Sequence, residues 1–190
     1  PVDRRDSPAS APPLLLEVDD VPEASTPFTL PTGTVTFLLT DVEGSTRLWQ
    51  DAPEVMGAVI ARHYDLLNEA IARFNGVRPV EQGEGDSVVG AFARTSDALA
   101  AALDAQRALA REDWPAGIDL RVRMAVHTGE AEQRGEQNYV GPSLIRCARI
   151  RSAGHGGQVL VSESAVAVAR DALPEGAELV DLGAHRLKDL

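Results

Sequence analysis

The amino-acid sequence predicts an α+β fold with a single sheet, because strand-like and helix-like patterns alternate along most of its 190 residues. A hairpin pattern lies between the first two helical stretches, and another strand follows the second of them. The order strand, helix, hairpin, helix, strand is the βαββαβ arrangement of ferredoxin-like domains, with the helices on one face of the sheet. We expect an extra helix and further strands at the C-terminal end.

Each element is predicted by its period and by the residues that bound it. β-Branched and apolar runs indicate strands, and apolar residues at i, i+3 and i+4 indicate amphipathic helices. Asn75-Gly76 ends the first helix, and the Gly-Glu-Gly-Asp sequence before Ser87 is typical of a hairpin turn. The predicted strands are 34–40, 77–80, 87–92, 120–126, 158–161 and 179–182, and the predicted helices are 55–74, 95–111, 142–152 and a last helix capped by Ser162.

The first 32 residues lack this periodicity. Seven of the 12 prolines lie before Gly33, interspersed with acidic residues. Such a segment cannot bury enough apolar surface to offset its ordering entropy. We therefore expect an acidic, proline-rich tail or linker over residues 1–32 and one domain over 33–190. The apolar alternation that runs to Leu190 without a closing turn predicts that the domain is part of a longer chain.

Composition and charge exclude several classes of function. The chain has 18 Lys and Arg against 29 Asp and Glu, a net charge of −11, which argues against nonspecific binding of nucleic acid or anionic membranes by this fragment. The single cysteine, Cys147, excludes an intramolecular disulfide framework and a multi-cysteine zinc site. No run approaches the roughly 18 apolar residues that a membrane span requires. We expect a soluble protein of the cytoplasm.

Two aspartates stand where the predicted elements could bring them together. Asp41 ends the first strand, and Asp86 lies at the tip of the hairpin. If both elements belong to one sheet, the carboxylates meet at one end of it, and such a pair suits Mg²⁺ or Mn²⁺ holding a polyphosphate. The alternatives are that Asp41 caps a helix and that Asp86 is an ordinary turn residue.

Three other residues are interpreted as structural. His127 ends a strand, where a lone histidine is usually a hydrogen-bonded core residue. His63 falls on the apolar face of the first helix, and Cys147 is expected to be a buried small apolar residue.

Four segments, taken in order and with their spacing, resemble class III adenylate and guanylate cyclase catalytic domains. Thr36–Thr46 (TFLLTDVEGST) resembles the opening motif of that family, and Gly85-Asp86-Ser87 resembles its second aspartate hairpin. Arg123–Gly129 (RMAVHTG) is similar to its central strand, with Ala125 where glycine is usual. Asn138–Ile150 is similar to its substrate-binding turn and helix. The resemblance extends from about Gly33 to the C-terminus.

The resemblance implies a metal-dependent reaction at the interface of a head-to-tail homodimer. Two Mg²⁺ or Mn²⁺ ions activate the 3′-hydroxyl of ATP or GTP, which attacks the α-phosphate to give a 3′,5′-cyclic nucleotide and pyrophosphate. Asp41 and Asp86 match the metal aspartates, and Val42 matches the residue that lends a backbone carbonyl. Arg149 matches the arginine that stabilises the transferring phosphate. Lys188 matches a lysine that contacts the terminal phosphates, or is a solvated lysine at a strand edge.

The sequence departs from the family at three substrate-binding positions. Gln82 replaces the adenine-reading lysine, Asn138 replaces the purine-reading acid, and Ile145 replaces the asparagine that orients the ribose. Two amides can still address a purine edge, with poor discrimination between bases. Ile145 has no hydrogen-bonding group, so it either leaves the ribose unpositioned or is simply a core residue of its helix.

Two functions remain open. The chain is a divergent cyclase of weak activity, or it is a catalytically inactive nucleotide-binding domain that regulates a larger signalling protein. Similar domains precede ATPase and helix-turn-helix segments in bacterial transcription regulators of the LuxR type. A heterodimer in which a second chain supplies the missing groups is a further alternative to the homodimer.

Overall fold

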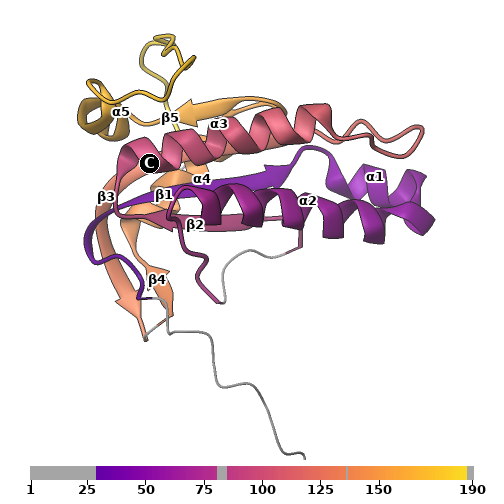
Figure 1. The fold of residues 1–190 in the computed structure, drawn as a ribbon, viewed down its shortest axis with the longest axis horizontal. Coiled ribbons are helices and arrows are strands. Elements are labelled where there is room, and N and C mark those ends of the chain that lie inside the picture. The colour runs from indigo at the N-terminus through magenta and orange to yellow at the C-terminus, as the bar shows by residue number, and fades with distance from the viewer. Residues whose placement is uncertain (1–28, 81–84, 136, 188–190) are drawn as a thin grey trace, which may run out of the picture.

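The computed structural model describes residues 29–80, 85–135 and 137–187, and it contains one mixed sheet with helices on both of its faces (Figure 1). The α+β prediction is confirmed. The strands are β1 (Gly33–Val42), β2 (Val88–Phe92), β3 (Val122–Arg134), β4 (Asn138–Val140) and β5 (Val159–Val161), and the helices are α1 (Ser45–Asp51), α2 (Pro53–Arg73), α3 (Thr95–Arg111), α4 (Pro142–Ala153) and α5 (Glu163–Ala169).

The sheet has the order β2-β1-β3-β4, and β5 pairs with β3 in parallel. β1 is central and antiparallel to both β2 and β3. The predicted strand 77–80 is reduced to a single bridge between Val77 and Ala91, because Pro79 has no amide hydrogen with which to extend a ladder. β3 is longer than expected, since its residues from Val122 to Ala131 pair with β1 and the next three pair with β4.

Both faces of β1 are covered, which explains its continuous burial from Val35 to Thr40. Leu38 and Val42 pack on the side of α2 and α3, whereas Phe37 and Leu39 pack on the side of α4. The alternation follows from the period of two in a strand. We expected the helices on one face, but α4 lies on the opposite face from α2 and α3 (Figure 1).

The chain is already folded shortly before β1. Leu30 is buried, and the Pro31 carbonyl accepts a hydrogen bond of 2.7 Å from the Tyr139 hydroxyl. Residues 1–28 of the expected tail lie outside the described residues.

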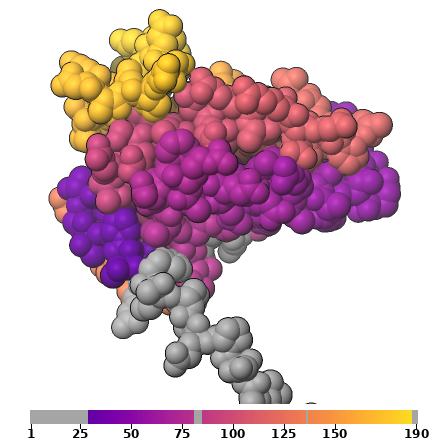
Figure 2. Space-filling view, in the orientation of Figure 1, coloured from indigo at the N-terminus to yellow at the C-terminus, as the bar shows by residue number. Residues whose placement is uncertain are grey.

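The segment after α5 stands out from the body of the molecule (yellow in Figure 2). The predicted strand 179–182 is wrong within the described residues, where this stretch forms no ladder and exposes Leu179, Val180 and Leu182. No helix in the described ranges combines the length and apolarity needed to cross a bilayer.

The end of α2 is fixed by backbone geometry. Asn75 adopts a left-handed conformation (φ 59°), and the amide of Gly76 donates to the Ile71 carbonyl at 2.8 Å. The Asn75 amide donates to the Ala72 carbonyl at 3.2 Å, which completes a Schellman motif. Gly76 lies against the ring of Phe92 and leaves no room for a Cβ atom, which would contact that ring and approach Ile71 Cγ2 to 2.8 Å.

The close approach at Gly76 predicts that Gly76→Ala destabilises the fold by about 1–3 kcal/mol, because overpacking moves neighbouring side chains off their rotamers. Gly57, on the exposed face of the same helix, has nothing within 4 Å of its would-be Cβ. Gly57→Ala should therefore stabilise the fold by about 0.5–1 kcal/mol. Urea unfolding of both variants measures these effects, and equal effects at the two positions would contradict the packing argument.

Candidate active site

The structure places Asp41 and Asp86 side by side at one end of the sheet. Thr40 pairs with Val88 across β1 and β2, so the residues that follow Thr40 lie next to those that precede Val88. The amide of Val42 donates to Asp86 Oδ2 at 2.8 Å, which ties the turn before β2 to the end of β1. Asp41 is not a helix cap, because the N-cap of α1 is Gly44. Asp86 is a turn residue, and its carboxylate connects the turn before β2 to the end of β1.

The Asp41 carboxylate is held by two guanidinium groups. It lies on the face of the sheet covered by α4, as Phe37 and Leu39 do. Arg123, its partner in the β1–β3 register, donates from Nε to Oδ1 and from Nη2 to Oδ2, both at 2.8 Å. Arg151 Nε lies 3.3 Å from Oδ2. This environment is mostly buried, with only 13% of the Asp41 side chain exposed.

Arg151 is a site residue that the sequence analysis missed. Its Nη1 donates to the Thr40 carbonyl at 3.0 Å and to Ser87 Oγ at 3.3 Å, so it contacts both segments that carry the aspartates, the end of β1 and the turn before β2. It follows Cys147 by four residues, and residues i and i+4 of a helix share a face. The predicted burial of Cys147 was therefore the available signal that Arg151 faces the sheet.

The donor set at this end of the sheet fits a hard divalent cation. Two carboxylates and the backbone carbonyl of Val42 are oxygen ligands of the kind that Mg²⁺ and Mn²⁺ prefer. Among the described residues, no group of three or more His, Cys, Asp or Glu side chains gathers at one place. The remaining coordination positions would have to be filled by water or by phosphate oxygens.

Asn138 lies at the far end of the sheet from the aspartates. It pairs with Arg134, eleven residues along β3 from Arg123, which is about 36 Å measured along the strand. In Figure 1, β4 and α1 accordingly lie at opposite ends of the sheet. A single chain therefore does not bring Asn138 to Asp41 and Asp86.

The other predicted substrate residues lie on α4 or outside the described residues. Arg149 is partly buried on α4, and Ile145 is 53% exposed. The interpretation of Ile145 as a core residue is therefore wrong. Gln82 and Lys188 lie outside the described residues. Val80 donates from its amide to the Gln137 carbonyl at 3.1 Å, so the last described residue before 81–84 lies close to Asn138.

The residues interpreted as structural are buried. His127 bonds through Nδ1 to Ser162 Oγ at 2.9 Å. Ser162 also caps α5, as predicted, by accepting from the amide of Ala165. Cys147 Sγ lies 3.5 Å from the Ala125 carbonyl, and burial raises the pKa of this thiol to about 12. A thiol with that pKa is unreactive at neutral pH.

His63, on α2, interacts electrostatically with Asp86. It is fully buried on α2, and neither ring nitrogen has a hydrogen-bond partner among the described residues. Burial lowers the pKa of His63 to about 4; Asp86 opposes the shift and Arg78 adds to it. The neighbouring Tyr64 donates from its hydroxyl to the carbonyl of Gly85, so α2 braces the turn that carries Asp86.

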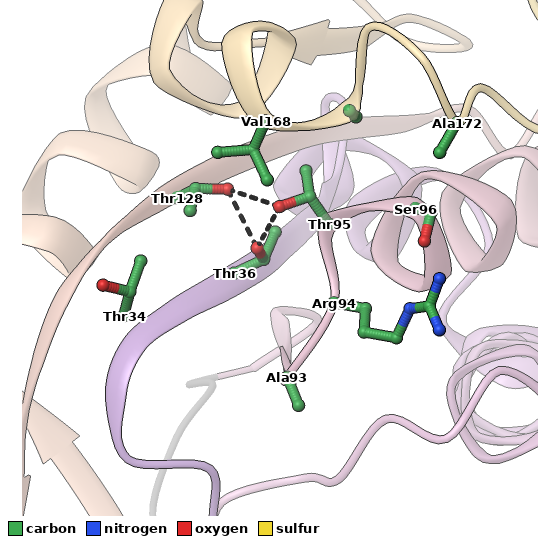
Figure 3. A pocket seen from close by; sticks show the side chains of 10 residues that line it. Thr34, Thr36, Ala93, Arg94, Thr95, Ser96, Thr128, Val168 and Ala172 are labelled. Atoms are coloured by element: carbon green, nitrogen blue, oxygen red, sulfur yellow. Dashed lines mark hydrogen bonds between the residues drawn. The ribbon is translucent and has the colours of Figure 1, made fainter.

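A separate cavity of about 320 Å³ lies toward the N-terminal end of β1, where α3 begins (Figure 3). Three buried threonines, one each from β1, α3 and β3, meet there. Thr36 Oγ1 lies 2.9 Å from Thr95 Oγ1 and 2.8 Å from Thr128 Oγ1, and the last two are 3.1 Å apart. The hydroxyls satisfy one another, so the cluster fastens α3 to the sheet.

The comparisons with known sequences point to one family. Residues 29–188 match the family model described as the adenylate and guanylate cyclase catalytic domain. An uncharacterized protein of Mycobacterium tuberculosis is 49% identical over 160 residues, which are 84% of this chain and 53% of that protein. The adenylate cyclase of Podospora anserina is 29% identical over 161 residues, covering 72% of this chain and 7% of that enzyme. The chain spans about half the length of its mycobacterial relative.

Solved structures agree with this result. An adenylate cyclase from Trypanosoma brucei in its monomeric state superposes with a TM-score of 0.72 at 26% identity, covering 92% of this chain and 90% of that one. The adenylyl cyclase CyaB of P. aeruginosa gives 0.65 at 19% identity, with 82% and 91% covered, and shows the shared fold. The resemblance expected from the sequence motifs is confirmed.

The buried, unpartnered ring of His63 predicts an acid-sensitive fold. Because the folded-state pKa is about 4 and the unfolded value is about 6.5, the unfolded chain binds the extra proton between these pH values. Stability is therefore lost as pH falls from about 6.5 toward 4. Methionine has a similar volume and does not titrate. The free energy of unfolding of His63→Met should therefore fall by about 2–3 kcal/mol less than that of the native protein when the pH is lowered to 4.5.

Urea unfolding of the native protein and His63→Met at pH 7.5 and pH 4.5 measures this contribution. The exposed His155 provides the control, and His155→Gln should keep the native pH dependence. Parallel pH profiles for the native protein and His63→Met would show that this ring does not cause the acid sensitivity.

Proposed function

The chain belongs to the adenylate and guanylate cyclase catalytic domain family, and from this premise we propose that it converts ATP or GTP slowly to a 3′,5′-cyclic nucleotide and pyrophosphate. The observation that carries the proposal is the placement of Asp41, at the end of β1, beside Asp86, in the turn that precedes the neighbouring antiparallel strand β2. A cytoplasmic location is part of the proposal, because nucleoside triphosphates are available there.

In this proposal, Asp41, Asp86 and the carbonyl of Val42 hold Mg²⁺ or Mn²⁺. A bound divalent cation supplies Lewis-acid polarisation and neutralises charge on the phosphates. The protein contributes a rigid frame, since the hydrogen bond from Val42 to Asp86 fixes the spacing of the two strands. Positioning and charge neutralisation are most of what phosphoryl transfer requires of a protein.

Completion of the site calls for a second chain. Asn138 lies at the end of the sheet opposite the aspartates of its own chain. A head-to-tail homodimer would place Asn138 and Arg149 of one chain next to Asp41 and Asp86 of the other. Arg149 would then neutralise charge on the transferring phosphate, and Lys188 would contact the terminal phosphates. A different partner chain with the same fold could take the same place.

Slow and unselective turnover follows from the substrate-binding residues. Gln82 and Asn138 offer amides to the purine edge, and an amide can donate or accept, so it discriminates weakly between adenine and guanine. Ile145 is exposed and cannot hydrogen-bond the ribose. Loss of one positioning contact in such a site costs on the order of 10²–10³ in rate.

The exposed Ile145 also favours a second candidate function, a catalytically inactive domain that binds a nucleoside triphosphate and regulates a larger protein. The metal-binding carboxylates suffice for binding in either case. A signalling protein or a transcription regulator of the LuxR type would be a suitable setting for such a domain.

The pairing of the aspartates predicts that Asp86→Asn weakens Mn²⁺-dependent binding of a nonhydrolysable ATP analogue at least tenfold, because the amide keeps the shape of the carboxylate and removes its charge. Isothermal titration calorimetry measures the affinity. Asp119→Asn is the matched control, since Asp119 is exposed and its loss changes the net charge equally. Binding that is insensitive to Asp86→Asn would refute the metal site.

The exposed position of Ile145 allows a test of turnover without disturbing the core. Ile145→Asn should raise cyclic nucleotide production on the order of 10² by restoring a ribose contact, and the triple change with Gln82→Lys and Asn138→Asp should add selectivity for ATP. Ile145→Ala removes the same apolar surface and serves as control. Product analysis with ATP, GTP and Mn²⁺ decides the outcome: background activity of the triple variant in a folded dimer would favour the inactive regulatory domain.

A further inference from the structure

Two positive and two negative side chains already balance one another at the aspartate end of the sheet. Arg123 and Arg151 lie against Asp41. The carboxylate of Asp86 accepts a hydrogen bond from the amide of Val42, the residue after Asp41. The side chains of Arg123, Arg151 and Asp41 are 27%, 17% and 13% exposed. Electrostatic interactions in such a partly buried group are only weakly screened by solvent. For these four side chains alone, a divalent cation that entered here would raise the net charge from 0 to +2, and withdrawal of one guanidinium would reduce it to +1.

The two arginines are held to different degrees. Arg123 makes a bidentate pair with Asp41, with both hydrogen bonds at 2.8 Å, and this fork geometry is the strongest that an arginine and a carboxylate can form. Arg151 Nε is close enough to Asp41 for an ion pair, but it is buried and has no aligned hydrogen-bond acceptor among the described residues. Its two hydrogen bonds run from Nη1 to neutral acceptors, the Thr40 carbonyl and Ser87 Oγ, and such bonds are weaker than those between a guanidinium and a carboxylate. Arg151 is therefore the group that can leave at lower cost.

The position of Arg151 on α4 also favours its side chain after withdrawal from Asp41. It lies in the last turn of α4, two residues before the helix ends at Ala153. A positive charge in that turn is favoured by the helix dipole even when the side chain points into solvent. The flexible arginine stem permits this movement without a change in the backbone.

We propose that Arg151 acts as an internal counterion of Asp41 that must withdraw before a divalent cation binds, and that it thereby lowers the metal affinity of this domain. The inference rests on the proposed function, because it assumes that Asp41 and Asp86 form the metal site. Arg123 remains in place and keeps Asp41 in position.

Calorimetric titration of the chain with Mn²⁺ alone, without nucleotide, tests the proposal. Arg151→Gln keeps a side chain that can hydrogen-bond to the Thr40 carbonyl, and it should bind Mn²⁺ at least tenfold more tightly than the native chain. Arg151→Lys retains the positive charge and should stay near the native affinity. Arg146→Gln, on the exposed face of the same helix, changes the net charge equally and should shift the affinity less than about twofold, because exposed charges are screened.

Equal Mn²⁺ affinity of Arg151→Gln and the native chain overturns the proposal, and so does an equal gain in Arg146→Gln, which would reveal an effect of net charge alone. Asp86→Asn separates this failure from failure of the proposed function. If Asp86→Asn abolishes binding while Arg151→Gln leaves it unchanged, only the counterion role is lost. If no variant shows binding that depends on Asp86, the metal site itself is refuted.

A measurement on the native chain keeps the test decisive if Arg151→Gln fails to fold. The Nε–H resonances of Arg123 and Arg151 can be followed by ¹⁵N NMR during titration with diamagnetic Mg²⁺. The Arg151 resonance should shift and exchange faster with water as Mg²⁺ binds, whereas that of Arg123 should stay protected. An unmoved Arg151 resonance at Mg²⁺ saturation, or a native chain that takes up no Mg²⁺ at all, overturns the proposal.

Discussion

The pairing of β1 with both of its neighbours is the constraint on which the rest of the site depends. β1 places Val88 opposite Thr40 on one side and Arg123 opposite Asp41 on the other. A slip of one residue would turn Asp41 from the α4 face toward α2 and separate it from both arginines. Such a slip is strongly disfavoured, because β1 is buried on both faces by two different apolar clusters. Core packing thus sets the register that fixes the position of the aspartates.

The register of β1 also places charged side chains in a partly buried environment. Asp41 faces two guanidinium groups on a sheet face that α4 covers, and the turn of Asp86 rests on α2 through Tyr64. His63, which interacts electrostatically with Asp86, is buried without a hydrogen-bond partner in the described part of the chain. Natural folds tolerate unfavourable groups of this kind mainly near functional sites, where other interactions hold them in place. The stability of this end of the molecule therefore depends on the same charged side chains that form the candidate site.

The length of β3 explains why the site residues fall into two groups. Asp41 and Asp86 lie at its beginning, and Asn138 pairs near its end. α4 runs back between the two ends, from Ser143, which bonds to the Glu130 carbonyl, to Arg151, which bonds to the Thr40 carbonyl. One helix therefore carries both the exposed Ile145 and, through Arg151, a buried contact with Asp41.

The sequence by itself determined the alternation of strands and helices, the capping role of Ser162, the burial of Cys147, and the family, because these depend on local periods and on contiguous motifs. Tertiary structure decided the rest. Pro79 reduced a predicted strand to a single bridge, and the exposed face of α4 made Ile145 a surface residue. Arg151 entered the site only because α4 crosses the sheet next to Asp41, 110 residues away in the chain. Contacts between residues so distant in sequence depend on how the helices dock on the sheet, which no local pattern specifies.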